Sequence, residues 1–149
     1  MQQRILVLFE QELVSQAALR SARELALRLG ASVTLLMLIA MSFGDRLLLS
    51  SKRRTIRQVE ERVGQRLDQL KGLYLADGIQ VDTDWRLGDP AKELLKFLAE
   101  RPPFQALIWG SHSGSGDRLP APRHWLGRLS ATFECPVLKV TAKGDLEQL

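Results

Sequence analysis

A run of small residues between Gly110 and Gly116 is the part of the sequence best suited to hold an anion. It reads Gly-Ser-His-Ser-Gly-Ser-Gly. Glycine and serine let backbone N–H groups approach a phosphate closely, and a helix that follows such a loop presents its positively polarised N-terminus. The residue types therefore predict a phosphate-binding loop that contains Gly110, Ser111, His112, Ser113 and Gly114.

Other motifs for catalysis or metal binding are absent from the sequence. There is no G-x4-G-K-[S/T] string, and the pentapeptide that starts at Gly110 has histidine where a hydrolase nucleophile elbow needs serine. The two histidines, His112 and His124, lack the spacing of a metal site. Cys135 is the single cysteine, and we expect a buried, inert thiol. The sequence therefore predicts no catalytic residues and no metal site, and it favours a protein that is not an enzyme.

Alternating apolar strands and amphipathic helices must position the loop. Continuous apolar runs indicate strands covered on both faces, and strict alternation in the third strand indicates the edge of a sheet. Apolar residues spaced by three or four indicate helices between the strands. The expected strands are residues 5–9, 33–39, 79–87, 106–109 and 136–140, and the expected helices are 14–29, 53–76, 90–101 and 123–133. This order predicts a three-layer α/β/α fold with a five-stranded parallel sheet.

Length and composition predict a single soluble domain. The chain has 149 residues, a net charge of +4 and 45% hydrophobic residues. Its longest apolar-leaning run, residues 31–43, is too short to span a membrane, and no signal peptide is evident. With one cysteine, the chain is expected to be cytoplasmic. We expect a core over about residues 3–141 and a polar tail over 142–149.

Positive charge is concentrated in the second predicted helix and the segment before it. Residues 46–71 hold eight basic and three acidic residues. Such a face can contact an acidic partner, membrane headgroups or nucleic acid. No aromatic residue interleaves with the arginines, so stacking on bases is not supported. We therefore expect a solvated face, without contact to nucleic acid or membrane.

Four segments of the sequence resemble the universal stress protein family. Residues 5–10 are similar to the apolar first strand with its acidic end, and residues 88–90 to the turn into the third helix. Residues 107–112 look like the fourth strand with its Gly-Ser-His continuation, and residues 136–140 like the final strand. The resemblance covers about residues 3–141. It implies a Rossmann-like fold, similar to adenine nucleotide alpha hydrolases, with strand order 3-2-1-4-5.

The family's ATP motif, G-x2-G-x9-G-[S/T], is only partly matched. Gly110 keeps the first position, but Ser113 occupies the second, and Arg123 and His124 stand in place of the final pair. Glu10 stands where the family has aspartate. A Cβ atom at these positions restricts the close approach of backbone to phosphate, although Arg123 can pair with phosphate as a charge.

The resemblance also implies where a nucleotide would lie. Adenine would take hydrogen bonds from the backbone near Leu38 and Ile39, and Glu10 would lie near the ribose or a metal. Phosphates would lie over Gly110–Gly114 and the start of the last helix, and ATP would bind with Mg²⁺. This edge of the sheet is also where ligands bind in open α/β folds, because the strand order reverses there.

Two hypotheses for function follow from the resemblance. The first is a small cytoplasmic stress-response or signalling protein that acts by binding as a homodimer, without robust nucleotide affinity. Its dimer would form through the final strand, Pro136–Val140, because an edge strand presents unpaired N–H and C=O groups. The alternative is an ATP- or AMP-binding switch, or a weak ATPase, that uses the Gly110–Gly116 loop.

Overall fold

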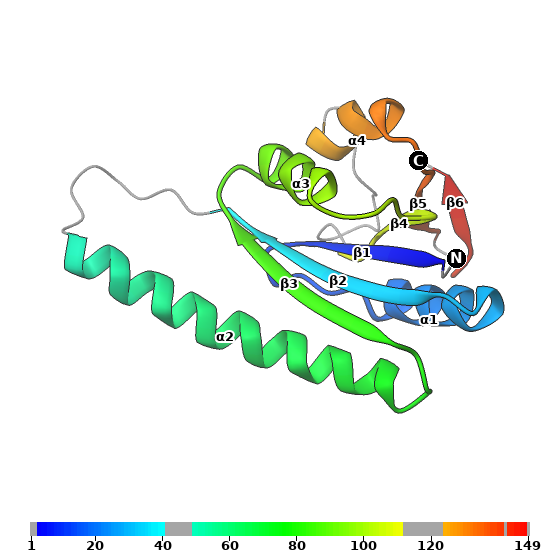
Figure 1. The fold of residues 1–149 in the computed structure, drawn as a ribbon, viewed down its shortest axis with the longest axis horizontal. Coiled ribbons are helices and arrows are strands. Elements are labelled where there is room, and N and C mark those ends of the chain that lie inside the picture. The colour runs from blue at the N-terminus through cyan, green and yellow to red at the C-terminus, as the bar shows by residue number, and fades with distance from the viewer. Residues whose placement is uncertain (1–2, 41–48, 112–123, 142, 149) are drawn as a thin grey trace.

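A computed structural model describes residues 3–40, 49–111, 124–141 and 143–148, and it shows one sheet between two helical layers (Figure 1). The strands are β1 (Arg4–Glu10), β2 (Ser32–Ile39), β3 (Val81–Leu87), β4 (Ala106–Trp109), β5 (Val137–Val140) and β6 (Leu146–Gln148). The helices are α1 (Gln16–Leu29), α2 (Leu49–Leu75), α3 (Pro90–Ala99) and α4 (Trp125–Leu129), with a 3₁₀ turn at Ser130–Thr132.

The sheet has the order β3-β2-β1-β4-β5-β6. The first five strands in this order are parallel, which confirms the predicted order 3-2-1-4-5, and β3 lies at an edge as expected. The prediction that β5 is an edge strand is wrong, because β6 pairs with it in antiparallel fashion. Residues 146–148 of the expected polar tail form this sixth strand.

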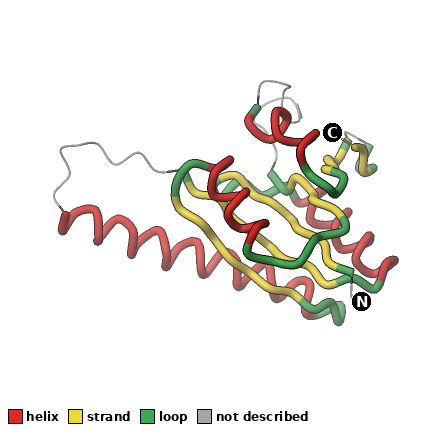
Figure 2. Tube along the Cα trace, turned by 45° about the horizontal axis from the view of Figure 1, so that its top comes forward, coloured by secondary structure: helices red, strands yellow, loops and turns green. Residues whose placement is uncertain are grey.

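The alternation of side chains along β1 divides the core into two layers. Ile5, Val7 and Phe9 pack with α1 and α2 on one face, whereas Leu6 and Leu8 pack with α3 and α4 on the other. Figure 2 shows helices on both sides of the strands. All five side chains are fully buried, which explains why the strand is a continuous apolar run.

Local capping signals set the limits of α1 and α3. The Ser15 hydroxyl accepts the Ala18 N–H at the start of α1, and Gly30 ends the helix in a left-handed conformation with φ of 64°. The Asp89 carboxylate accepts the Lys92 N–H at 3.0 Å, and Pro90 occupies the first turn of α3. The end of α1 and the start of α3 agree with the helices predicted over residues 14–29 and 90–101, whereas α4 is shorter than the predicted helix over residues 123–133.

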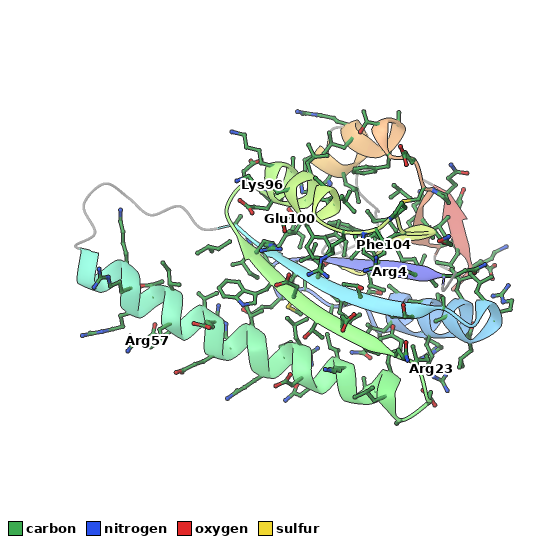
Figure 3. The ribbon with its side chains drawn as sticks, viewed as in Figure 1. Arg4, Arg23, Arg57, Lys96, Glu100 and Phe104 are labelled. Carbon is green, nitrogen blue, oxygen red and sulfur yellow. The ribbon has the colours of Figure 1, made fainter. Side chains whose placement is uncertain are left out.

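Helix α2 is longer than predicted and extends past the sheet at its N-terminal end (Figure 1). Its packed face begins at Val59 and continues through Val63 to Tyr74. Arg57, before this face, lies on the side of the helix away from the sheet (Figure 3). In the part of the chain that the structure describes, no helix is both long and apolar enough to cross a membrane.

Candidate functional site

The carboxylate of Glu10 lies at the carboxyl end of β1, where the strand order reverses between β1 and β4. Its Oε2 atom is 2.8 Å from His124 Nε2, and its Oε1 atom accepts the indole N–H of Trp125 at 3.3 Å. Both partners belong to the start of α4. The predicted site residues Glu10 and His124 are therefore brought together, in direct contact with each other.

His124 also caps the helix that it precedes. Its Nδ1 atom accepts the Leu126 N–H at 3.1 Å, so this nitrogen carries a lone pair rather than a proton. The proton of the neutral ring then lies on Nε2, which donates to the Glu10 carboxylate. The contact is a hydrogen bond from a neutral imidazole to a carboxylate, and it fixes one tautomer of His124.

Ser111 is buried beside Glu10, and its hydroxyl hydrogen-bonds to the backbone of the loop between β1 and α1. Its hydroxyl oxygen accepts the backbone N–H of Glu10 at 2.9 Å, and the hydroxyl donates to the carbonyl of Leu13. The neighbouring carbonyl of Gly110 accepts the Ser15 N–H at 2.7 Å. The first two residues of the predicted phosphate loop are thus engaged in holding the end of β4 to the start of α1.

Gly110 is required by packing on its own side of the sheet. A Cβ atom at this position would lie 2.6 Å from Phe9 Cε1 and 2.8 Å from Val7 Cγ1. These atoms belong to the apolar core, so a side chain at Gly110 would collide with the core. The sequence predicts a phosphate-binding role for this glycine, whereas the contacts with Phe9 and Val7 give a packing reason for it.

Leu38 and Ile39, the predicted adenine contacts, lie at the end of β2 next to Glu10. Their side chains are buried, so only their backbone groups can face a ligand. The Leu38 carbonyl already accepts the Gln11 N–H at 2.8 Å, and the Ile39 carbonyl accepts the Gly88 N–H at 3.0 Å. Gln11 has a left-handed backbone with φ of 57°, which is uncommon outside glycine and marks strain beside the site.

Two tryptophans complete the site: Trp125, which the sequence places near it, and Trp109, which the sequence suggests is a core residue. The ring of Trp109 lies edge-on to His124, with centroids 5.1 Å apart, and 6.2 Å from the ring of Trp125. The indole nitrogen of Trp109 is buried and has no hydrogen-bond partner among the described residues. Their positions in the sequence are the signal that could have placed them at the site. Trp109 ends the fourth strand, and Trp125 follows the histidine that starts α4.

The remaining predicted residues, His112, Ser113, Gly114 and Arg123, lie outside the described part of the chain. Within the described ranges, no three residues of the types His, Cys, Asp and Glu gather into a metal-binding group. Cys135 is partly exposed rather than buried, and burial of its thiol still raises the pKa above its ordinary value. A raised pKa disfavours the reactive thiolate.

The family model named "Universal stress protein family" matches residues 1–140. A comparison with curated proteins found no match. Among solved structures, the chain is similar to a universal stress family protein from Burkholderia pseudomallei. The two are 22% identical with a TM-score of 0.62, and 92% of this chain and 96% of that one are covered.

Two further structures of similar fold contain a nucleotide. A universal stress protein in complex with cAMP is 15% identical, with a TM-score of 0.58 and coverage of 93% of this chain and 97% of that one. A family protein from Arabidopsis thaliana with AMP bound is 15% identical, with a TM-score of 0.52 and coverage of 93% and 94%. At these identities the likeness shows a shared fold.

Proposed function

Because the chain belongs to the universal stress protein family, we propose that it is a small cytoplasmic stress-response or signalling protein that acts by binding, with weak affinity for ATP. The observation that supports weak ATP affinity is the Glu10 carboxylate, held at the reversal point by His124 and Trp125. A triphosphate at this edge would lie beside the negative charge of Glu10. The neighbouring donors His124 and Trp125 already hydrogen-bond to this carboxylate.

The contacts of the described residues support weak binding of a triphosphate and its metal ion. The Ser111 hydroxyl and the Gly110 carbonyl hydrogen-bond to the loop before α1. The carbonyls of Leu38 and Ile39 each accept a backbone N–H. A triphosphate would therefore meet groups that already have partners and the negative charge of Glu10, and repulsion by that charge costs free energy.

A second candidate is an adenine nucleotide switch. It is favoured by the buried indole N–H of Trp109, a donor beside His124 that has no acceptor among the residues that the structure describes. The cAMP and AMP complexes of proteins with the same fold give this candidate a plausible ligand class. A monophosphate carries less charge than ATP and would be repelled less by Glu10.

Nucleotide titration of the nucleotide-stripped protein separates the two candidates. Thermal unfolding is measured with ATP, AMP and cAMP up to millimolar concentration, with and without Mg²⁺, because a ligand that binds the native state raises the unfolding temperature. We expect no shift with ATP. A clear ATP-dependent shift would overturn the first proposal, and a shift with AMP or cAMP alone would favour the second.

Glu10→Gln and a matched control, Glu12→Gln, test whether the Glu10 carboxylate limits ATP affinity. Glu10→Gln removes the charge and keeps an acceptor for His124, so it should raise any ATP affinity if the carboxylate is the barrier. Gly110→Val does not test phosphate approach, since its side chain would collide with Phe9 and Val7. Glu12→Gln is a matched control, because Glu12 pairs with Arg62 at 2.7 Å outside these contacts.

A further inference from the structure

A cleft of about 530 Å³ lies at the end of the sheet where β2 and β3 begin, opposite the end that carries Glu10 (Figure 1). Its volume falls in the range of small-molecule sites, roughly 300–1,000 Å³. The first residues of three strands and the last turns of α2 form its walls. Its lining includes Arg4, Ser32, Lys71, Leu75, Val81 and Asp82.

Strand register places three polar side chains of the cleft on one face of the sheet. Arg4 lies directly opposite Ser32 across the β1–β2 ladder, and Thr34 lies opposite Asp82 across the β2–β3 ladder. Because side chains alternate along a strand, Arg4, Ser32 and Asp82 point to the same side. The Ser32 hydroxyl has no hydrogen-bond partner among the described residues, so it can serve a ligand.

Arg4 is fixed in position, yet it keeps donors for a ligand. Its guanidinium lies over the ring of Phe104, 4.6 Å from the centroid (Figure 3), and one Nη atom donates to the Pro102 carbonyl at 3.0 Å. A guanidinium has five N–H donors in a planar fork, so most of them remain for other acceptors. A guanidinium held in this way is suited to a carboxylate, because little side-chain freedom is lost on binding.

Charged side chains of both signs line the cleft without an ion-pair partner among the described residues. They are Arg4, Lys71 and Asp82. The carboxylate of Asp84, two positions further along β3, differs from that of Asp82, because it pairs with Arg101 at 3.1 Å. Lys71 and Asp82 carry opposite charges and line the same cleft, yet they do not pair with each other. Each can therefore receive the opposite charge of a ligand.

The end of α2 adds an apolar wall and a partial charge to the cleft. Leu75 is the last residue of this helix, and half of its surface is exposed. It gives the apolar part of a ligand a surface to cover. The C-terminus of a helix carries a partial negative charge, so the end of α2 favours a positive group of the ligand, as Asp82 does.

We propose that this cleft binds a free α-amino acid with an apolar side chain. The carboxylate of the ligand pairs with Arg4 and Lys71, its ammonium group pairs with Asp82, and its side chain contacts Leu75. A zwitterion suits unpaired charges of both signs, whereas a simple anion or cation would face one charge of its own sign. The inference does not rest on the proposed function, and nucleotide titration at Glu10 does not test it.

Titration of the full chain with three related compounds tests the two charges of the ligand separately. The compounds are L-leucine, 4-methylpentanoate, which lacks the ammonium group, and 3-methylbutylamine, which lacks the carboxylate. Binding is followed into the millimolar range by the NMR shifts of the backbone amides around the cleft. We expect L-leucine to bind, and each of the other two to bind about fivefold more weakly or less, because each lacks one ion pair.

Two variants assign these charges to residues of the cleft. Asp82→Asn should abolish the preference for L-leucine over 4-methylpentanoate, because it removes the partner of the ammonium group. Lys71→Met should weaken both carboxylates about fivefold and leave 3-methylbutylamine unaffected. Lys92→Met is the matched control, because it removes the same charge from an exposed residue of α3 that does not line the cleft. It should bind L-leucine as the unmodified protein does.

Three results would overturn the proposal. The first is the absence of saturable shifts with L-leucine at the residues that line the cleft. The second is equal affinity of the unmodified protein for L-leucine and 4-methylpentanoate. The third is unchanged binding of L-leucine by Asp82→Asn and Lys71→Met proteins that fold, as judged by circular dichroism. Both side chains lack an ion-pair partner among the described residues, so we expect both variants to fold.

Discussion

Glu10 and His124 join the end of β1 to the start of α4 by a hydrogen bond of 2.8 Å, although 114 positions separate them in the chain. The same imidazole caps α4 through its other nitrogen. His124 therefore has two structural tasks, one at each ring nitrogen, and different substitutions remove one or both of them.

Replacing His124 should separate these tasks. His124→Ala removes the cap and the donor to Glu10, and we expect it to lower the free energy of unfolding by about 1–2 kcal/mol. His124→Asn keeps a good capping acceptor but is too short to reach Glu10, so it should recover part of the loss. Urea unfolding at neutral pH measures both variants, and equal stability of the two would contradict a capping role.

Gly110 should be intolerant of any side chain, whatever the ligand. Gly110→Ala places a Cβ atom against Phe9 and Val7, and we expect it to lower the free energy of unfolding by about 1–3 kcal/mol. Gly64→Ala on α2 is the control, because its Cβ would meet nothing within 4 Å. It should raise stability by about 0.5–1 kcal/mol in a helix interior. Urea unfolding compares them, and an unaffected Gly110→Ala would refute the packing argument.

Tyr74 should make the fold sensitive to alkali. Its hydroxyl donates to the Leu19 carbonyl at 2.7 Å, and burial raises the pKa of the phenol above its ordinary value. The neutral form is therefore favoured in the folded state. Its contribution is complete below the unfolded pKa of about 10 and is lost as the pH rises above that value.

Tyr74→Phe tests this dependence. We expect it to lower the free energy of unfolding by about 1 kcal/mol at neutral pH, through loss of the hydrogen bond, and to flatten the decline in alkali. Tyr74 is the single tyrosine, so ultraviolet absorbance of tyrosinate follows its ionisation directly. Ionisation of Tyr74 in the folded protein near pH 10 would contradict the prediction.

The exposed arginines before the packed face of α2 should contribute little to stability. Arg53 and Arg57 are solvent-exposed, and Arg53→Glu with Arg57→Glu should change the free energy of unfolding by no more than about 0.5 kcal/mol. Arg23→Glu is the contrasting control, because it breaks an ion pair with Asp77 and should be destabilising. Urea unfolding measures both.

The same double variant tests the expectation of a solvated face. We expect the unmodified protein to bind neither duplex DNA nor acidic vesicles in a salt-dependent manner. Fluorescence anisotropy and vesicle sedimentation at low and high salt give the measurement. Binding that weakens with salt and disappears in the double variant would assign a partner to this end of α2.

The parts of the fold that depend on local chemistry were predicted well from the sequence. The predicted end of α1 at residue 29 and start of α3 at residue 90 are correct, with Gly30 and Asp89 as their caps, and the alternation in β3 marked it as an edge strand. Each of these features is decided within a few neighbouring residues. The strand order came from the family resemblance, because apolar periodicity alone does not say which strands are neighbours.

Features that depend on distant contacts were missed. Three mostly polar residues at 146–148 carry no strand signal, and only the ladder with β5 makes them a strand. Gly110 looked like a loop glycine because its collision partner, Phe9, is about 100 positions away in the chain. The contact between Trp125 and Glu10 depends in the same way on the packing of α4 over the sheet.

The central position of β1 has a consequence for synthesis of the chain on the ribosome. One neighbour, β2, is made soon after β1, but the other, β4, supplies the partner of Ile5 only at Ala106. Until then the buried apolar segment Ile5–Phe9 of β1 has one open side. We expect the half of the sheet that contains β1, β2 and β3 to form first, and a nascent chain that stops before Ala106 to be prone to aggregation and to chaperone capture.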